Sequence, residues 1–246
     1  MHRILSLIGK LALAIGLLAL VLWNGLVDQS FIKDDPVARF WLLAVTGALV
    51  LVDAIVSAIR TFRAKGRDER KEAIRKALLP VLRQIARTHQ LDVTILGAST
   101  YTTGRKRLKR VDRYRMSELP QESKVTWISN KGVIGQAWKT SEIRHVDWLP
   151  IHKKWGKGQI KNEADWALVP DEDRFGFEMD EFNNIVDKYS EILAVPMLRA
   201  GSAKCVGVLA IDVPIRANAP TNVLQDDEIV EKAAEAAGVI QQRLNR

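Results

Sequence analysis

The segment EILAVPMLRAGSAKCVGVLAIDV, which runs from Glu191 to Val213, decides the fold of this chain. Two apolar runs, Glu191–Leu198 and Lys204–Val213, flank the turn-forming sequence Ala200-Gly201-Ser202. Near-continuous apolar runs of this length are typical of buried strands. The segment therefore predicts a hairpin whose two strands lie at the centre of a sheet.

Shorter segments complete the predicted fold. Alternation and turn residues predict strands or extended pieces at Asp92–Thr102, Arg107–Met116, Lys124–Ile128 and Ile143–Trp148. Helical periodicity predicts helices at Arg60–Gln90, Gly132–Lys139 and Asp226–Leu244. Pro150–Ser190 has neither pattern and is predicted to be a long, irregular insertion. This order indicates an α+β fold in which helices cover one face of a central antiparallel sheet.

The first and last of these helices each carry an apolar seam. The two seams consist of Ile74, Leu78, Val81 and Ile85, and of Ile229, Ala233, Ala236 and Ile240. A sheet offers its helices only one face to pack on, so part of each seam is free for a second copy. We therefore expect a parallel homodimer through these two helices.

Two apolar segments precede this domain. Ile4–Trp23 and Phe40–Ile59 are each long enough, as helices, to cross a bilayer, and each is interrupted by one charge, Lys10 or Asp53. In an antiparallel hairpin these two charges lie at the same depth, so we expect an intramembrane pair. It fixes the hairpin, or alternatively forms part of an ion path. A cleaved signal peptide is the competing interpretation of the first segment.

The flanking charges predict the orientation of this hairpin. The connection Asn24–Val37 is net acidic, and the stretch Arg60–Lys76 is strongly basic. Short basic flanks stay in the cytoplasm, so both termini are expected there, in a two-span integral protein of the bacterial inner membrane. The predicted domains are a transmembrane hairpin at 1–60, a connecting helix at 61–90 and a cytoplasmic domain at 91–246.

Two stretches of the cytoplasmic domain resemble the GAF family. They are GVIGQAWKTSEIRHVDW from Gly132, with its glycine–x–x–glycine start of a helix, and ILAVPMLRAGSAKCVGVLAIDVP from Ile192. The resemblance covers about Leu78 to Leu244. It implies a GAF-like domain with a central antiparallel sheet and flanking helices. It also implies a role in small-molecule binding or in dimerisation, because the family contains both kinds of member.

Aromatic residues gather in and beside the long insertion. The candidate ligand-binding residues are Trp138, Trp148, Trp155, Trp166, Phe175 and Phe177. Long loops in compact domains are often lids, and this aromatic density argues against disorder. We expect either a lid over a ligand pocket or a secondary hydrophobic cluster under the loop.

The formal net charge of +8 is concentrated in two places. One is Arg60–Lys76, and the other is the second predicted strand with the turn before it. This second cluster is a candidate anion patch made of Arg105, Lys106, Arg107, Lys109 and Arg110. Membrane lipid headgroups are the expected partner of this charge. No nucleic-acid partner is expected, because neither cluster contains a recognised reading motif or interleaved aromatic residues.

Catalytic and metal chemistry have little support in the sequence. The single cysteine, Cys205, excludes an intrachain disulfide and a cysteine-based zinc site. His145, Asp147 and His152 are possible metal ligands, but such a group is common by chance and we expect no metal. No nucleophile–base arrangement, phosphate loop or carboxylate pair stands out, so we expect no enzyme. No cofactor is identified.

The sequence leaves three functions open. The favoured one is a membrane-anchored sensory or ligand-binding module that couples small-molecule binding or dimerisation to the hairpin. The alternatives are a ligand-triggered effector whose oligomerised hairpins perturb the bilayer, and a ligand-free dimerising scaffold. No output domain is expected after the last helix.

Overall fold

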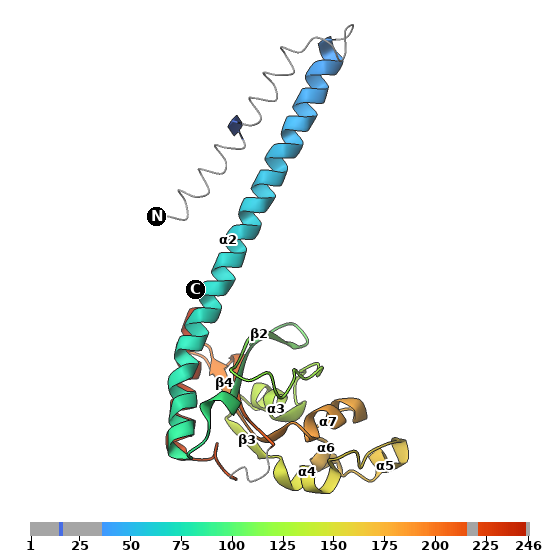
Figure 1. Ribbon diagram of the computed structural model, residues 1–246, viewed down its shortest axis with the longest axis vertical. Coiled ribbons are helices and arrows are strands. Elements are labelled where there is room, and N and C mark those ends of the chain that lie inside the picture. The colour runs from blue at the N-terminus through green and yellow to red at the C-terminus, as the bar shows by residue number, and fades with distance from the viewer. Residues whose placement is uncertain (1–14, 17–35, 216–220, 245–246) are drawn as a thin grey trace. The chain divides into compact units, whose positions relative to one another are not determined.

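The computed structural model describes residues 15–16, 36–215 and 221–244 (Figure 1). The chain divides into two compact units, Met1–Glu69 and Arg70–Arg246. The first unit contains the beginning of helix α2 (Pro36–Thr88), whose end belongs to the second unit. All the described strands belong to the second unit, which carries the candidate site.

The first unit corrects the prediction of a membrane protein. Nowhere among the described residues is a helix both long enough and apolar enough to cross a bilayer, which contradicts the predicted two-span localisation. Phe40–Ile59 is not a separate apolar element. It contains Asp53, which is exposed, and it belongs to a helix that continues into the charged residues after Ile59. The first predicted span lies outside the described residues except for Ile15 and Gly16. Lys10 lies outside them too, so its pairing with Asp53 stays a prediction.

Five antiparallel strands form the sheet of the second unit, in the order β2-β1-β5-β4-β3. Strand β5 is central and β4 lies beside it, with Leu193 paired to Ile211. The predicted central hairpin is therefore confirmed. The strands are β1 (Gly97–Thr103), β2 (Leu108–Arg115), β3 (Arg144–Asp147), β4 (Tyr189–Leu198) and β5 (Cys205–Pro214). A short 3₁₀ helix, η1 (Val93–Ile95), occupies the start of the predicted strand Asp92–Thr102.

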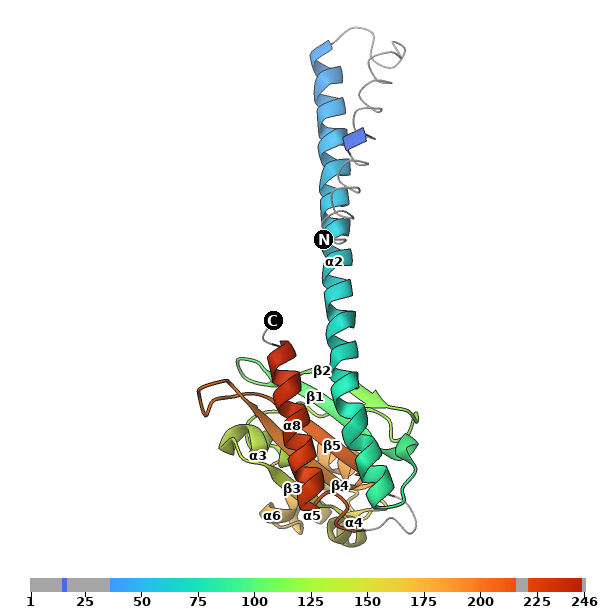
Figure 2. The ribbon, with the colours of Figure 1, turned by 90° about the vertical axis from the view of Figure 1, so that its left-hand side faces the viewer.

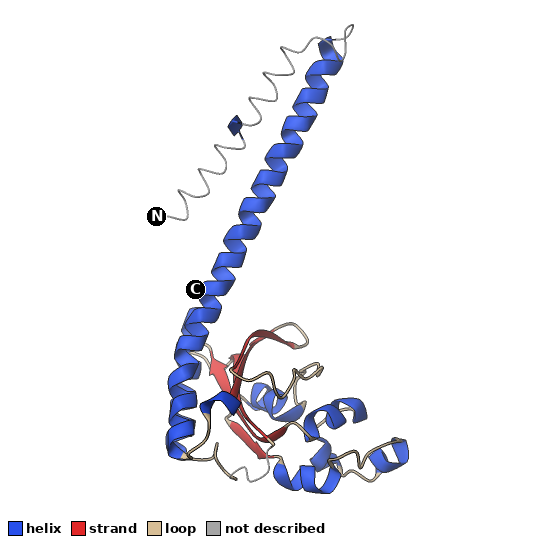
Figure 3. Cartoon of the chain, in the orientation of Figure 1, coloured by secondary structure: helices blue, strands red, loops and turns tan. Residues whose placement is uncertain are grey.

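Helices cover both faces of this sheet. The end of α2 and helix α8 (Asp227–Leu244) lie side by side on one face, over a core that includes Leu209 (Figure 2). On the other face, α3 packs against β3, β4 and β5, and four shorter helices lie on the same side of the sheet (Figure 3). These helices are α3 (Gly132–Thr140), α4 (Leu149–Trp155), α5 (Glu163–Ala167), α6 (Asp171–Arg174) and α7 (Met179–Val186).

This arrangement confirms the α+β class and the antiparallel sheet with flanking helices. The expectation that helices cover only one face is wrong. The insertion Pro150–Ser190, which was expected to be irregular, folds into short helices. Its apolar residues, such as Phe182 and Ile185, are fully buried in a second core on that face. Burial of this apolar surface stabilises the layer of helices on the second face of the sheet.

The predicted helix seams lie inside the chain. All eight seam residues belong to the core between α2, α8 and the sheet, and none is more than 5% exposed. These side chains are therefore not available to a second copy. Homodimerisation stays a prediction, and it requires another surface.

A buried carboxylate ties the start of α8 to the sheet. Glu191 of β4 has no exposed surface and accepts hydrogen bonds from the backbone amides of Val223 and Leu224, both at 2.9 Å. His145 Nε2 lies 3.0 Å from the same carboxylate, and Gln225 Nε2 lies 3.0 Å from His145 Nδ1. Because an ionised carboxylate only accepts hydrogen bonds, His145 donates to Glu191 from Nε2.

The glycine–x–x–glycine sequence shapes the start of α3. Gly132 has a φ of +58°, and a Cβ there would lie 2.6 Å from the Phe177 ring and 2.9 Å from the Trp127 ring. A Cβ on Gly135 would lie 2.2 Å from the Ile128 carbonyl oxygen. Both positions therefore require glycine. The helix start holds the preceding segment, including Trp127, against the sheet face.

Candidate ligand-binding site

A cavity of about 280 Å³ lies beside β2, on the sheet face that α3 covers. Its volume is near the lower end of the range for small-molecule pockets, which is roughly 300–1,000 Å³. Strand β2 forms one wall, and the irregular segment 116–131 forms the other. The principal lining residues are Tyr101, Leu108, Val125 and Trp127, which are buried, and the charged Arg107, Lys109, Arg110 and Glu122.

A second, water-sized pocket of about 20 Å³ adjoins this cavity over the sheet. The two share four lining residues: Tyr101, Arg110, Ser123 and Trp127. The smaller pocket adds polar groups from four further strand positions: Ser99, Arg113, Tyr189 and Asp212. The site as a whole therefore has an apolar floor and a group of cationic and hydroxyl side chains.

A β-bulge explains why arginines gather on this face. Successive strand residues normally point to opposite faces, so Arg110 and Arg113 would face opposite ways in a regular strand. The register between β1 and β2 shifts between Thr100 and Tyr101, so that Arg110 pairs with Tyr101 and Arg113 pairs with Ser99. The extra residue, Val111, puts both arginines on the cavity face.

The bulge has the opposite effect on Asp112. This carboxylate points to the other face of the sheet, where Arg75 of α2 donates to it from Nε at 3.0 Å. Asp112 is almost fully buried, and Arg75 is half exposed. Neighbouring residues of β2 therefore contact the cavity on one side and α2 on the other.

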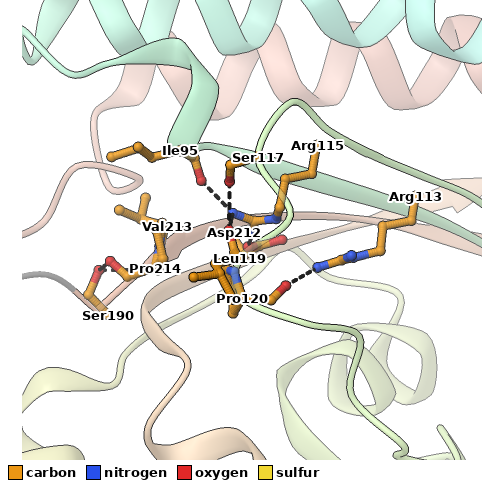
Figure 4. Close-up of polar contacts among 10 residues, drawn as sticks. All are labelled: Ile95, Arg113, Arg115, Ser117, Leu119, Pro120, Ser190, Asp212, Val213 and Pro214. Carbon is orange, nitrogen blue, oxygen red and sulfur yellow. Dashed lines mark hydrogen bonds and ion pairs between the residues drawn. The ribbon is translucent and has the colours of Figure 1, made fainter.

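The arginines of β2 have different partners (Figure 4). Arg115 is buried and pairs with Asp212 of β5 and with the Ile95 carbonyl. Arg113 donates from Nη2 to the Pro120 carbonyl at 2.5 Å and, among the described residues, forms no ion pair. Arg110 pairs with Glu122 at the cavity. Only Arg115 thus has a buried carboxylate of its own.

Two tyrosines add hydroxyl groups to the site. Burial raises the pKa of Tyr101 and of Tyr189 above the usual value, and the neighbouring arginines Arg110 and Arg113 oppose this only in part. Both hydroxyls therefore stay protonated at neutral pH. They are available as hydrogen-bond donors to an anion.

The surroundings of Arg113 hold an excess of positive charge. Burial lowers the pKa of Lys188, and repulsion from Arg113 and Lys124 lowers it further. The Lys188 ammonium donates to Asn184 Oδ1 at 2.7 Å, which is a neutral partner. A negative charge bound nearby would relieve this repulsion. The arrangement of charges and donors therefore favours binding of an anion.

The predicted aromatic site residues lie elsewhere in the second unit. Trp148 and Phe177 are buried in the core of the α3 face, and Trp138, Trp155, Trp166 and Phe175 pack at its edge. None of the six lines either of the two cavities described above. Trp148 contacts Phe175, with ring centroids 5.0 Å apart, and Trp166 contacts Phe182 at 5.3 Å. This placement corresponds to a hydrophobic cluster under the insertion.

The predicted basic cluster lies partly at the cavity. Arg107, Lys109 and Arg110 line it, whereas Arg105 and Lys106 are exposed in the β1–β2 turn. Tyr101, Trp127 and Arg113 also belong to the site, although the sequence did not single them out. An aromatic residue next to a basic strand was the available signal for Trp127, whereas the position of Arg113 depends on the bulge.

The other candidate groups have local structural partners. His152 Nδ1 lies 2.9 Å from Asp187 Oδ1, and His145 is bound to Glu191, so the two histidines do not share a site. Among the described residues no group of three or more potential metal ligands is present. Cys205 is buried, its thiol donates to the Gly207 carbonyl at 3.0 Å, and burial raises its pKa.

No family model and no curated relative matches this chain. Solved structures give weak likenesses. A GAF domain/HD domain protein from Geobacter sulfurreducens has 11% identity over 73% of this chain and 99% of its own, with a TM-score of 0.45. The reduced form of fRMsr from Staphylococcus aureus has 16% identity over 72% and 94%, with a TM-score of 0.39.

A third likeness is to the GAF domain of a two-component sensor histidine kinase from Bacillus halodurans. It has 14% identity over 66% of this chain and 92% of its own, with a TM-score of 0.37. These values are too low for any of the three to establish an activity. The five-stranded antiparallel sheet with helices on both faces fits the GAF-like fold that the sequence resemblance implied.

Proposed function

We propose that Arg70–Arg246 is a sensory, ligand-binding module of the GAF type, whose small-molecule ligand binds in the cavity beside β2. The observation that carries this proposal is the cavity itself. It combines a buried aromatic wall, Trp127 and Tyr101, with the guanidinium group of Arg110. Apolar walls with a few convergent polar groups are typical of small-molecule sites.

The proposal includes binding and no catalytic step. Ser123 lines both cavities, but their lining residues include no histidine or cysteine. The lining residues therefore do not supply the serine–histidine or cysteine–histidine pair of a typical nucleophile. The thiol of Cys205 is buried, with a raised pKa, and does not line either cavity.

The test is a search for bound small molecules. The purified full chain is studied by native mass spectrometry, and molecules released on denaturation are identified. Ser123→Trp would fill the cavity from its wall, and Ser129→Trp, at an exposed position outside the lining, is the matched control. We expect a bound molecule in the wild type and the control, and its loss from Ser123→Trp. Equal retention by Ser123→Trp would mean that the ligand binds elsewhere.

A further inference from the structure

The ion pair between Arg110 and Glu122 lies at the cavity and is weakly held. Both residues line the cavity, and their side chains are 27% and 56% exposed. Glu122 belongs to the segment 116–131, which contains no helix or strand. Ion pairs with this exposure contribute little net stability, because water and salt screen them. The pair can therefore open without unfolding the domain.

The charges around this pair do not balance. Asp212 neutralises Arg115, and Asp112 neutralises Arg75 on the opposite face of the sheet. Arg107, Lys109 and Arg110 line the larger cavity, where Glu122 is the one acidic lining residue. The adjoining pocket adds Arg113 and Asp212, but the Asp212 carboxylate already pairs with Arg115. One weakly held carboxylate thus faces a group of cations.

The floor of the cavity is apolar next to these cations. Tyr101 and Trp127 form an edge-to-face pair with ring centroids 6.2 Å apart, and Leu108 and Val125 are buried beside them. Such a surface favours a ligand whose main part, its body, is flat and apolar. A ligand that combines this body with a negative group would satisfy both halves of the site.

We infer that the ligand is an organic anion, a carboxylate or phosphate on a planar apolar body, whose negative group displaces Glu122 from Arg110. This inference rests on the proposed function, because it names the chemical class that the same cavity binds. Glu122 is then a built-in competitor that occupies the anion position in the empty site. Release of Glu122 removes one of the contacts that hold the segment 116–131 beside β2.

The test uses benzoate and phenyl phosphate as probes, with benzyl alcohol as the neutral counterpart. Binding to the full chain is measured by isothermal titration calorimetry at constant ionic strength. We expect at least one of the two anions to bind saturably and benzyl alcohol to bind at least tenfold more weakly. Comparison of the two anions distinguishes a carboxylate ligand from a phosphate ligand.

Charge-matched variants test the competition. Removing Glu122 as a competitor in Glu122→Gln should tighten anion binding about fivefold, given the modest contribution of an exposed ion pair. Glu118→Gln removes the same charge from an exposed residue of the same segment that does not line the cavity, and it should leave the affinity unchanged. Arg110→Gln should weaken binding at least tenfold.

Three results would overturn the inference. They are failure of both anions to bind the wild type and Glu122→Gln, equal binding of benzyl alcohol, and equal effects of Glu118→Gln and Glu122→Gln. A neutral molecule found in the cavity by mass spectrometry would also overturn it, while leaving the proposed function intact.

Discussion

Replacing Glu191 with glutamine should destabilise the second unit by about 3 kcal/mol. The carboxylate is fully buried and accepts two backbone amide hydrogen bonds, at 2.9 Å each, and one from His145. A glutamine amide keeps one acceptor oxygen but turns an NH₂ group toward a donor. At least one hydrogen bond to a charged group is then lost, at roughly 1.5–3 kcal/mol, and a buried donor is left without a partner, at roughly 1–3 kcal/mol.

The pH dependence of stability should change in a defined direction. Burial raises the pKa of Glu191, but the hydrogen bonds from His145, Leu224 and Val223 outweigh it and hold the pKa below the usual value. The unfolded chain therefore binds this proton more readily. The stabilisation is fully present above the ordinary glutamate pKa and is lost as the pH falls through the lower, folded-state pKa.

The assay is urea unfolding of the full chain, followed by circular dichroism, at pH 7 and at pH values down to 3. The difference in unfolding free energy between wild type and Glu191→Gln should be largest at pH 7 and should shrink on acidification. Glu142→Gln, whose carboxylate is exposed and pairs with exposed Arg144, should change stability by less than about 0.5 kcal/mol. A Glu191→Gln protein as stable as the wild type at pH 7 would refute the reasoning.

Three further predictions concern packing, reactivity and coupling. Gly132→Ala should lower the unfolding free energy by about 2–4 kcal/mol in the same assay, because the added Cβ clashes with its neighbours in addition to the strain of a positive φ. The control is Gly158→Ala, with φ of +72° and nothing within 4 Å of the added Cβ, which should lower it by only about 1 kcal/mol. Equal losses in the two variants would contradict the clash. Cys205 should react with iodoacetamide at least a hundredfold faster in urea than in the native protein, because its thiol is buried. A double-mutant cycle of Arg75→Gln and Asp112→Asn should give a coupling free energy of about 1–2 kcal/mol by urea unfolding, and a value near zero would mean that the pair does not link β2 to α2.

The core of the second unit was predictable because its pattern is local. The apolar runs of Glu191–Leu198 and Lys204–Val213 could only be central strands, and they became β4 and β5. The helix start at Gly132 followed equally from its glycine spacing. The insertion Pro150–Ser190 was missed because its helices are only four to eight residues long where they lie within it. Helical periodicity needs more residues to be recognised.

The candidate site was only half predictable for a different reason. Arg107, Lys109 and Arg110 form a run of charge that any reading detects. Arg113 joins them only because the bulge changes which side chains face the cavity, and a bulge has no clear sequence signature. Trp127 is a wall of the cavity because the α3 start, remote from β2 in sequence, holds it in place.

Strand β2 connects the two faces of the sheet through adjacent residues beside its bulge. Asp112 and Arg113 are consecutive residues, yet one contacts α2 and the other contributes to the pocket. Strand β2 lies at the edge of the sheet and has a single neighbouring strand, β1. A ligand in the pocket that shifted Arg113 would therefore also shift the contact between Asp112 and Arg75 of α2. The pocket and α2 would then be coupled through two consecutive residues, Asp112 and Arg113, and not through the hydrophobic core.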